Sequence, residues 1–270
     1  MGVPVAEDFV LTTAEVPAPG PKEFVVRVTM ISLDPAMRGW LDDQPSYLPP
    51  IGIGEVIRAS GVGEVVASAH PRYPVGTQVT GTFGVQTHAL VDAAGDLARI
   101  DPELGTPSMY LGVLGLTGMT AYFGLLEHGR PRAGDTVVVS AAAGAVGSIT
   151  GQLAAINGCR VVGVAGGPDK CRYVTDTLGF DAAVDYKAPR IRAALRGACP
   201  DGIDVYFDNV GGAVLVAALA NLAMHARIVV CGLISQYTAA GPVPGPSNLG
   251  ALLVQRARME GFIVLDHGDK

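Results

Sequence analysis

The eight residues Ser-Ala-Ala-Ala-Gly-Ala-Val-Gly at positions 140–147 have the composition and setting of a phosphate-binding turn. The segment before them, residues 136–141, is apolar and β-branched, which predicts a buried strand. The segment after them, residues 147–157, is rich in small residues and predicts a helix. The N–H groups at the start of such a helix, together with the helix dipole, can bind the phosphates of a dinucleotide.

Three positions of this turn carry the small residues that a dinucleotide fingerprint requires. Ala142 stands at the tight turn, Gly144 where the backbone must approach the pyrophosphate, and Gly147 where helix and strand pack closely. Ala142 departs from the usual glycine, whereas the strand–turn–helix context favours the fingerprint. The alternative is a crossing of small residues that binds no ligand.

The end of the next predicted strand, residues 160–165, indicates which nicotinamide cofactor the turn would bind. An NAD site has Asp or Glu there, about twenty residues after the turn, to bind the ribose 2′-hydroxyl. This strand instead leads into two glycines, and Asp169 follows only in the first helical turn, where it compensates the helix dipole. The adjacent Lys170 favours a 2′-phosphate, hence NADP; the alternative is an ordinary solvated lysine.

Cysteine and histidine are too scattered to indicate a metal centre. The four cysteines and five histidines form no C-x-x-C pair and no group with the spacing of zinc ligands. We therefore expect reduced thiols in a cytoplasmic protein. The formal net charge of −6 and the lack of a basic stripe argue against a nucleic-acid partner.

Composition and length indicate a globular protein with an ample core. Of the 270 residues, 49% are hydrophobic and 16% charged, which excludes a disordered chain. Two uncharged stretches, residues 136–159 and 209–226, are long enough to span a bilayer. Glycines and polar residues interrupt both, so we expect buried elements and no membrane partner. The first residues do not resemble a signal peptide.

The chain changes character near residue 120. Before it, short apolar runs alternate with turns that contain proline and glycine, which predicts a compact all-β barrel. Strands are expected there at residues 24–31, 52–59, 63–67, 78–82 and 87–91.

After residue 135, predicted strands and helices alternate. This rhythm predicts right-handed βαβ units and a doubly wound parallel sheet, and thus an α/β fold. The expected strands cover residues 136–141, 160–165, 182–186, 203–207, 227–231 and 260–265, and the expected helices residues 147–157, 169–178 and 213–224.

Seven motifs resemble the medium-chain dehydrogenase/reductase superfamily. They lie at residues 32–39, 52–56, 116–122, 141–147, 207–212, 231–237 and 258–261. The resemblance is strongest to the zinc-independent NADPH-dependent double-bond reductases, the group of curcumin, prostaglandin and 2-alkenal reductases. It implies a β-rich GroES-like catalytic domain over residues 1–118 and an NADP-binding Rossmann domain over residues 119–270.

The resemblance also implies which residues contact NADP(H). Lys170 matches the lysine at the 2′-phosphate, with Tyr186 near it, and Asn209 lies near the nicotinamide ribose. Residues 262–264 match a backbone segment near the carboxamide. The implied set is Met119, Thr120, Gly144, Ala145, Val146, Gly147, Lys170, Tyr186, Asn209, Cys231, Gly232, Leu233, Ile234, Ser235, Gln236, Tyr237, Phe262, Ile263 and Val264.

The implied reaction delivers a hydride to the β-carbon of an α,β-unsaturated ketone or aldehyde. The resulting enolate oxygen needs a hydrogen-bond donor, and the resemblance assigns that role to Tyr237. Tyr47 is expected to line the substrate pocket. Each tyrosine has a structural alternative, Tyr237 as a loop residue and Tyr47 as packing for the Pro49-Pro50 corner. Residues 31–37 lack the cysteine of the zinc-dependent members, which disfavours alcohol oxidation through zinc.

Two alternative functions are consistent with the resemblance. One is an NADPH:quinone reductase of the same superfamily, and the other is a truncated cofactor-binding remnant without turnover. Family members continue for several dozen residues beyond the position of Lys270, so we expect a C-terminally truncated chain whose catalytic domain lacks its return segment. A homodimer is expected through the last Rossmann strand.

Overall fold

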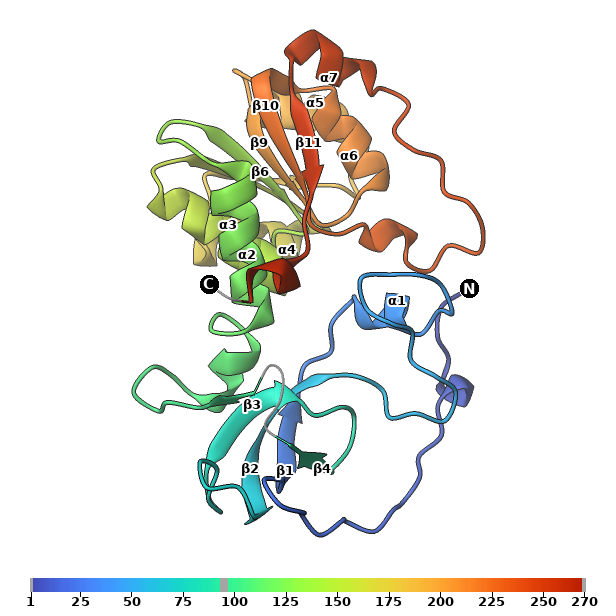
Figure 1. Ribbon diagram of the computed structural model, residues 1–270. Helices are drawn as coiled ribbons and strands as arrows, with labels where there is room; N and C mark the ends of the chain where they lie inside the picture. The colour runs from blue at the N-terminus through green and yellow to red at the C-terminus, as the bar shows by residue number, and fades with distance from the viewer. Residues whose placement is uncertain (1, 93–96, 269–270) are drawn as a thin grey trace. The chain divides into compact units, whose positions relative to one another are not determined.

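The computed structural model describes residues 2–92 and 97–268 (Figure 1). The chain forms two compact units, Met1–Gly115 and Leu116–Lys270, here called the N-terminal and C-terminal units. Each unit contains one sheet, antiparallel in the first and parallel in the second. The expected mixed α/β architecture, with a β-rich part followed by a Rossmann-like sheet, is confirmed.

The N-terminal unit contains a five-stranded sheet with the strand order β4-β1-β2-β3-β5. Its core consists of inward-facing residues of β1 and β2, such as Phe24 and Val65, with the ring of Tyr73 stacked on Phe24. The elements are η1 (Ala6–Asp8), β1 (Phe24–Ile31), α1 (Met37–Trp40), β2 (Ser60–Ser68), β3 (Gln78–Thr82), β4 (His88–Val91), β5 (Ala98–Arg99) and η2 (Pro107–Leu111).

The strand predicted at residues 52–59 was wrong, because no strand forms within that range and β2 begins only at Ser60. A turn replaces its first half: the Glu55 N–H donates to the Gly52 carbonyl at 3.1 Å. The Glu55 carboxylate accepts the Gly52 N–H at 2.8 Å, and Gly54 adopts a φ of 86°. A residue with positive φ cannot continue an extended strand, and glycine adopts that conformation at little cost.

The C-terminal unit contains a six-stranded parallel sheet with the order β11-β10-β9-β6-β7-β8. The chain runs outward from β6 to β8 and then returns to β9 on the other side, so the topological switch point lies between β6 and β9. The strands are β6 (Thr136–Ser140), β7 (Arg160–Ala165), β8 (Ala182–Asp185), β9 (Ile203–Asp208), β10 (Leu222–Val230) and β11 (Arg258–Gly261).

Alternate residues of β6 face two different helical layers, because side chains alternate along a strand. Val138 packs in one core with Leu195 and Leu215, whereas Val137 and Val139 pack in a second core. The helical segments are α2 (Leu116–Phe123), η3 (Gly124–Gly129), α3 (Ala145–Ile156), α4 (Pro168–Arg172), η4 (Tyr173–Thr177), α5 (Ile191–Ala198), α6 (Gly212–Leu219), η5 (Ile234–Gln236), α7 (Gly250–Gln255) and η6 (Val264–His267).

Several predicted elements have different bounds; the strand predicted at residues 227–231, for example, covers Leu222–Val230. The helix predicted at residues 213–224 ends at Leu219, because Asn221 turns the chain into β10 through a bond from its side chain to the Ala217 carbonyl. The strand predicted at residues 260–265 covers Arg258–Gly261, and η6 follows it. The segment between Gly261 and η6 therefore lies beyond the hydrogen bonds of the sheet.

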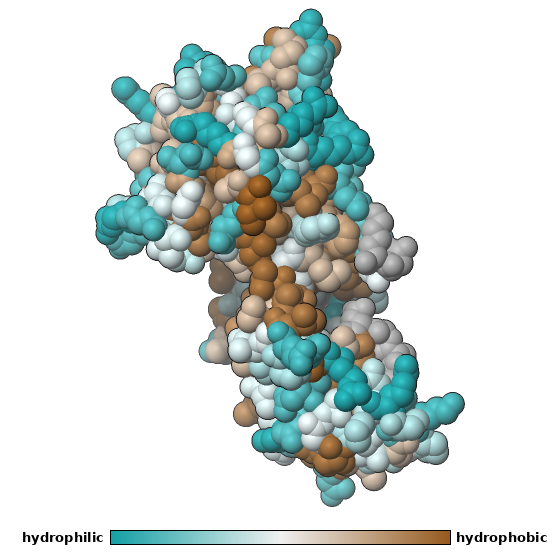
Figure 2. Space-filling view, turned by 90° about the vertical axis from the view of Figure 1, so that its left-hand side faces the viewer, coloured by the Kyte–Doolittle hydropathy of each residue, from teal (hydrophilic) through white to brown (hydrophobic). Residues whose placement is uncertain are grey.

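Hydrophobic side chains are also found on the surface. Figure 2 shows one face of the molecule, on which hydrophobic patches lie among hydrophilic residues. In α7, Leu253 and Val254 are 82% and 66% exposed. Exposed apolar groups that gather on one element mark contact surfaces.

Within the part of the chain that the structure describes, no helix has the length and hydropathy needed to cross a membrane.

Helix α3 packs closely against the ring of Phe180, which precedes β8, because Gly151 has no side chain. A Cβ at this position would lie 1.8 Å from Cζ of Phe180. We predict that Gly151→Ala lowers the free energy of unfolding by about 1–3 kcal/mol, because an overpacked core must shift.

Gly197→Ala is the matched control. Gly197 also lies within a helix, α5, and a Cβ there would meet no atom within 4 Å. It should stabilise the protein by about 0.5–1 kcal/mol, since glycine costs that much inside a helix. Urea denaturation measures both changes, and equal effects of the two substitutions would contradict the prediction.

Candidate cofactor site

The glycine-rich turn lies where β6 ends and α3 begins. Gly144 is the N-cap of α3, and the first helical bond joins the Ser148 N–H to the Gly144 carbonyl at 2.9 Å. The N–H groups of residues 145–147 precede that bond and have no partner within the helix. Gly144 and Ala145 are exposed. The turn therefore presents N–H donors at a helix N-terminus, the arrangement that binds phosphate.

Backbone geometry explains why this turn needs small residues. A Cβ at Gly147 would lie 2.3 Å from the Ala141 carbonyl oxygen, so a side chain there would push the helix away. Ala141 itself adopts a φ of 50°, an uncommon conformation for a residue with a side chain. The Ala142 N–H donates to the Val164 carbonyl at 3.0 Å and ties the turn to β7. Close packing and an open phosphate cradle thus occur together.

The end of β7 forms a second part of the site. After Ala165 the chain turns through Gly166 and Gly167, and the ring of Tyr186 lies against Gly166. A Cβ at Gly166 would lie 2.8 Å from the Tyr186 ring. Lys170 is exposed in α4, directly after this turn. The structure therefore brings Tyr186 to the turn that precedes Lys170, although the two are distant in sequence.

The carboxylates of this corner already have partners. Asp169 forms an ion pair with Arg172, one helical turn away. Asp185, at the end of β8, accepts the N–H groups of Gly167 at 2.8 Å and Lys187 at 2.9 Å. These two backbone bonds hold the pKa of Asp185 below its ordinary value. Both carboxylates are therefore engaged, Asp169 by an arginine and Asp185 by backbone N–H groups.

Asp185 is a residue that sequence reasoning missed. The search for an acidic residue was limited to the second strand of the sheet, β7, whereas Asp185 ends the third. Its function also differs from the expected one, because its carboxylate fixes the Gly167 turn through backbone hydrogen bonds. The sequence signal that could have indicated Asp185 is an aspartate at the end of a predicted strand, followed by a tyrosine.

A buried carboxylate organises the switch point between β6 and β9. Oδ1 of Asp208 accepts hydrogen bonds from Ser140 Oγ and Tyr206 Oη, both at 2.9 Å. It also accepts the N–H groups of Val210 and Gly211, both at 3.0 Å. Loss of solvation, followed by the charge of Asp208, raises the pKa of Tyr206 well above its ordinary value. The Tyr206 hydroxyl therefore stays protonated as a donor.

Asn209 belongs to the same hydrogen-bond network. Its N–H donates to Ser140 Oγ at 2.7 Å, and its side-chain Nδ2 donates to the Ser140 carbonyl at 2.8 Å. The Gly232 N–H donates to the Asp208 carbonyl at 3.0 Å, which brings the segment after β10 to the same place. Asn209 thus stands at the sheet's carboxyl edge, between the segments that follow β6 and β10.

The predicted donor Tyr237 lies in the segment after β10. Its hydroxyl accepts the Leu233 N–H at 3.2 Å, and a Cβ at Gly232 would lie 3.1 Å from that oxygen. Because the hydroxyl accepts from the backbone, its own proton can still be donated. The neighbouring Cys231 thiol has its pKa raised to about 12, mainly by burial, so it remains protonated near neutral pH.

The remaining predicted residues fall into three groups. In α2, Thr120 donates its hydroxyl to the Leu116 carbonyl at 2.6 Å, and Met119 is partly exposed. After β11, the Phe262 ring packs against Gly124 and meets Phe207 edge-on, so this ring is engaged in packing. Ile263 and Val264, Val146 at the turn and Gln236 after β10 are all half-buried.

Most predicted residues therefore lie at one edge of one sheet. The segments around Gly144, Lys170, Tyr186, Asn209 and Tyr237 each follow the carboxyl end of a parallel strand, where open α/β sheets bind their ligands. Tyr47 belongs to the N-terminal unit, where it is half-exposed. Among the described residues, no three His, Cys, Asp or Glu side chains are grouped to hold a metal ion.

Both parts of the chain match known family models. Residues 1–99 match the N-terminal domain of oxidoreductase, and residues 145–269 match a model described as zinc-binding dehydrogenase. The chain is 46% identical to NADPH-dependent curcumin reductase of Escherichia coli, over all of this chain and 79% of that protein. It is 41% identical to the NADP(+)-dependent 2-alkenal reductase of Nicotiana tabacum, over 92% of this chain and 73% of that protein.

A solved structure agrees with these matches. CurA from Vibrio vulnificus in complex with NADPH superposes with a TM-score of 0.92 and 45% identity, over 98% of this chain and 80% of that chain. The doubly wound sheet with a phosphate turn defines a dinucleotide-dependent oxidoreductase. The chain belongs to the zinc-independent, NADP-dependent double-bond reductases of the medium-chain dehydrogenase/reductase superfamily.

Proposed function

We propose that this protein reduces the carbon–carbon double bond of α,β-unsaturated ketones or aldehydes with NADPH, by hydride transfer to the β-carbon. The observation that carries the proposal is the position of Tyr237, whose hydroxyl lies over Gly232 at the carboxyl edge. Relatives named for curcumin and 2-alkenal reduction support the substrate class.

The chain's own residues fit a 2′-phosphorylated dinucleotide. The N–H groups of residues 145–147 would bind the pyrophosphate, and the absence of a side chain at Gly147 lets the start of α3 pack on the turn. Lys170 would pair with the 2′-phosphate, and Tyr186 would lie beside it. Because Asp169 and Asp185 are engaged with Arg172 and with backbone N–H groups, the corner suits a phosphate better than a bare ribose hydroxyl.

The nicotinamide end would lie at the other part of the carboxyl edge. Asn209 would contact the ribose, and the segments around residues 231–237 and 262–264 would surround the ring. Met119 and Thr120 would face the nicotinamide from α2. When bound, NADPH supplies the hydride, and the protein supplies orientation and polarisation.

Tyr237 would stabilise the charge that develops on the substrate. Hydride addition at the β-carbon leaves negative charge on the carbonyl oxygen, and a proton must then reach the α-carbon. A neutral hydroxyl donates a hydrogen bond to that oxygen without first being charged. Tyr47 of the N-terminal unit is proposed as a substrate contact, since its ring is half-exposed.

A homodimer through β11 is part of the proposal. This strand is at the edge of the six-stranded sheet, and Arg258 and Gly261 at its ends are exposed. An exposed edge strand has unpaired backbone groups that can pair with a second chain. The exposed Leu253 and Val254 of α7 precede it. We expect sedimentation velocity to give about twice the mass of one chain, and a monomer would contradict this.

The reaction and the role of Tyr237 are tested together. The protein is mixed with NADPH and an enone, and both loss of NADPH absorbance and formation of the saturated ketone are followed. Tyr237→Phe should lower kcat about a hundredfold or more, the cost of losing one oxyanion donor, with little change in NADPH affinity. Tyr173→Phe, which alters a partly exposed tyrosine of η4, is the matched control.

Three outcomes would contradict parts of this proposal. An unchanged rate in Tyr237→Phe removes the tyrosine from the mechanism. Turnover of quinones but not of enones replaces the proposed reaction by quinone reduction. Binding of NADPH without turnover of either substrate class indicates a cofactor-binding protein.

Cofactor selectivity depends on Lys170 in this proposal. Lys170→Ala should weaken NADPH binding about ten- to hundredfold, because a charge-assisted contact contributes about 1.5–3 kcal/mol. NADH binding should change little, since NADH has no 2′-phosphate. Arg192→Ala removes an exposed cation from α5 and serves as the control. Equal affinity of the unmutated protein for both cofactors, measured by fluorescence titration, would refute the assignment.

A further inference from the structure

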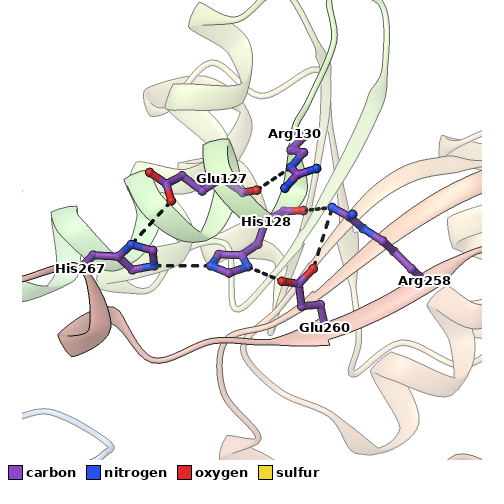
Figure 3. Close-up of polar contacts among 6 residues, drawn as sticks. All are labelled: Glu127, His128, Arg130, Arg258, Glu260 and His267. Atoms are coloured by element: carbon purple, nitrogen blue, oxygen red, sulfur yellow. Dashed lines mark hydrogen bonds and ion pairs between the residues drawn. The ribbon is translucent and has the colours of Figure 1, made fainter. Parts of the chain in front are cut away.

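Two histidines that are distant in sequence meet beside β11 (Figure 3). Nε2 of His128, in η3, lies 3.5 Å from Nε2 of His267, in η6. At the outer ends, Nδ1 of His128 lies 2.8 Å from Oε1 of Glu260, and Nδ1 of His267 lies 3.6 Å from Oε2 of Glu127. The four side chains form a continuous row: carboxylate, imidazole, imidazole, carboxylate.

The geometry determines how many protons the two imidazoles carry. A proton on Nδ1 of His128 would be donated to Glu260, and a proton on Nδ1 of His267 would face Glu127. A hydrogen bond between the two facing Nε2 atoms requires a proton on one of them and a lone pair on the other. A row with all of these contacts would share three protons between its two imidazoles.

Aromatic packing holds both rings in place. The His128 ring stacks on Phe262 with centroids 5.0 Å apart, and the His267 ring stacks on Phe123 with centroids 4.4 Å apart. Both histidine side chains are largely buried, 19% and 11% exposed. The histidine pair thus connects α2 and η3 to the segment that follows β11.

Further charged groups surround the pair. Arg258 of β11 donates to the His128 carbonyl at 2.8 Å and lies 3.9 Å from Glu260, and Arg130 donates to the Glu127 carbonyl at 2.8 Å. From β10, Arg227 donates to the Gly129 carbonyl and pairs with Asp135. Asp266 adjoins His267 in η6. The bond from His128, followed by the nearby positive charges, lowers the pKa of Glu260.

The segment Phe262–Val264 lies between the two attachment points of this row. Glu260 precedes it and His267 follows it, while the hydrogen bonds of the sheet end at Gly261. Within the segment, the Ile263 carbonyl accepts the Asp266 N–H at 3.1 Å, a local bond that does not reach another element. Its attachment to η3 therefore comes from side chains, chiefly His128 and Phe262.

We propose that His128 and His267, with Glu260 and Glu127, are positioning residues that hold the backbone of residues 262–264 in its binding conformation. The inference deepens the proposed function, in which that segment receives the nicotinamide carboxamide. In a row that shares three protons, a fourth proton at acid pH would turn both Nε2 atoms into donors that face each other. The contact then opens and the segment is released.

The first test uses NADPH-free protein and needs no turnover. Hydrogen–deuterium exchange of residues 262–268 is measured across a pH series and corrected for the intrinsic exchange rate. His128→Phe keeps a ring on Phe262 but removes both hydrogen bonds, and it should lower protection of these amides about tenfold or more. His267→Phe, which keeps the stack on Phe123, should do the same. His225→Asn, at an exposed position with a φ of 62°, is the control.

The variant His128→Gln distinguishes the effect of imidazole protonation from the effect of ring packing. A glutamine amide can donate to Glu260 and accept from His267, and it does not titrate near neutral pH. It should therefore keep the protection at neutral pH and lose the acid-dependent release that the unmutated protein undergoes. If packing alone held the segment, His128→Phe would match the unmutated protein, and that result would overturn the proposal.

The second test measures cofactor binding and turnover. His128→Phe should raise the Kd and KM for NADPH about tenfold with kcat changed less than about twofold, whereas His128→Gln should restore both at neutral pH. Unchanged Kd values in both phenylalanine variants would contradict the positioning role. Acid-dependent release in His128→Gln equal to that of the unmutated protein would overturn the proton count. If the proposed reaction itself fails, the exchange data on NADPH-free protein still decide the role of the row.

Discussion

The carboxyl edge of the parallel sheet depends on one buried oxygen atom, Oδ1 of Asp208. It accepts four hydrogen bonds, from Ser140, Tyr206, Val210 and Gly211. Through Ser140 and the two backbone N–H groups, it joins the end of β6 to the turn after β9. A buried donor left without a partner costs about 1–3 kcal/mol, so removing this acceptor would disturb four groups together. The positions of Asn209 and of the segment after β10 follow from this network.

At the same edge, two carboxylates are engaged by backbone N–H groups or by an arginine. Asp185 accepts two backbone N–H groups and Asp169 pairs with Arg172, so both carboxylates have partners. A carboxylate that accepts backbone N–H bonds remains ionised but is already engaged. The ring of Tyr186 lies against Gly166, so a side chain at position 166 would not fit. A corner built in this way favours an anion, which agrees with the family to which the chain belongs.

The sheet and the histidine row meet at β11. This strand is the last of the sheet, and only its partner β10 holds it by hydrogen bonds. The chain beyond Gly261 is then carried by aromatic stacking and by the row from Glu127 to Glu260. The nucleotide edge thus combines a centre joined by hydrogen bonds to Asp208 with a border segment held mainly by side-chain contacts.

Local sequence patterns determined much of this protein. The apolar segment 136–141, the small residues at 140–147 and the alternation that follows predicted the strand, the turn and the doubly wound sheet, because these depend on neighbouring residues. The strand predicted at 52–59 failed because Gly54, which has a positive φ, lies in a turn there. Only the tertiary structure decided that Asp185 holds Gly167 and that His128 meets His267, 139 positions later. Such contacts depend on how elements that are distant in sequence pack together, and hydrophobic periodicity in the sequence does not predict them.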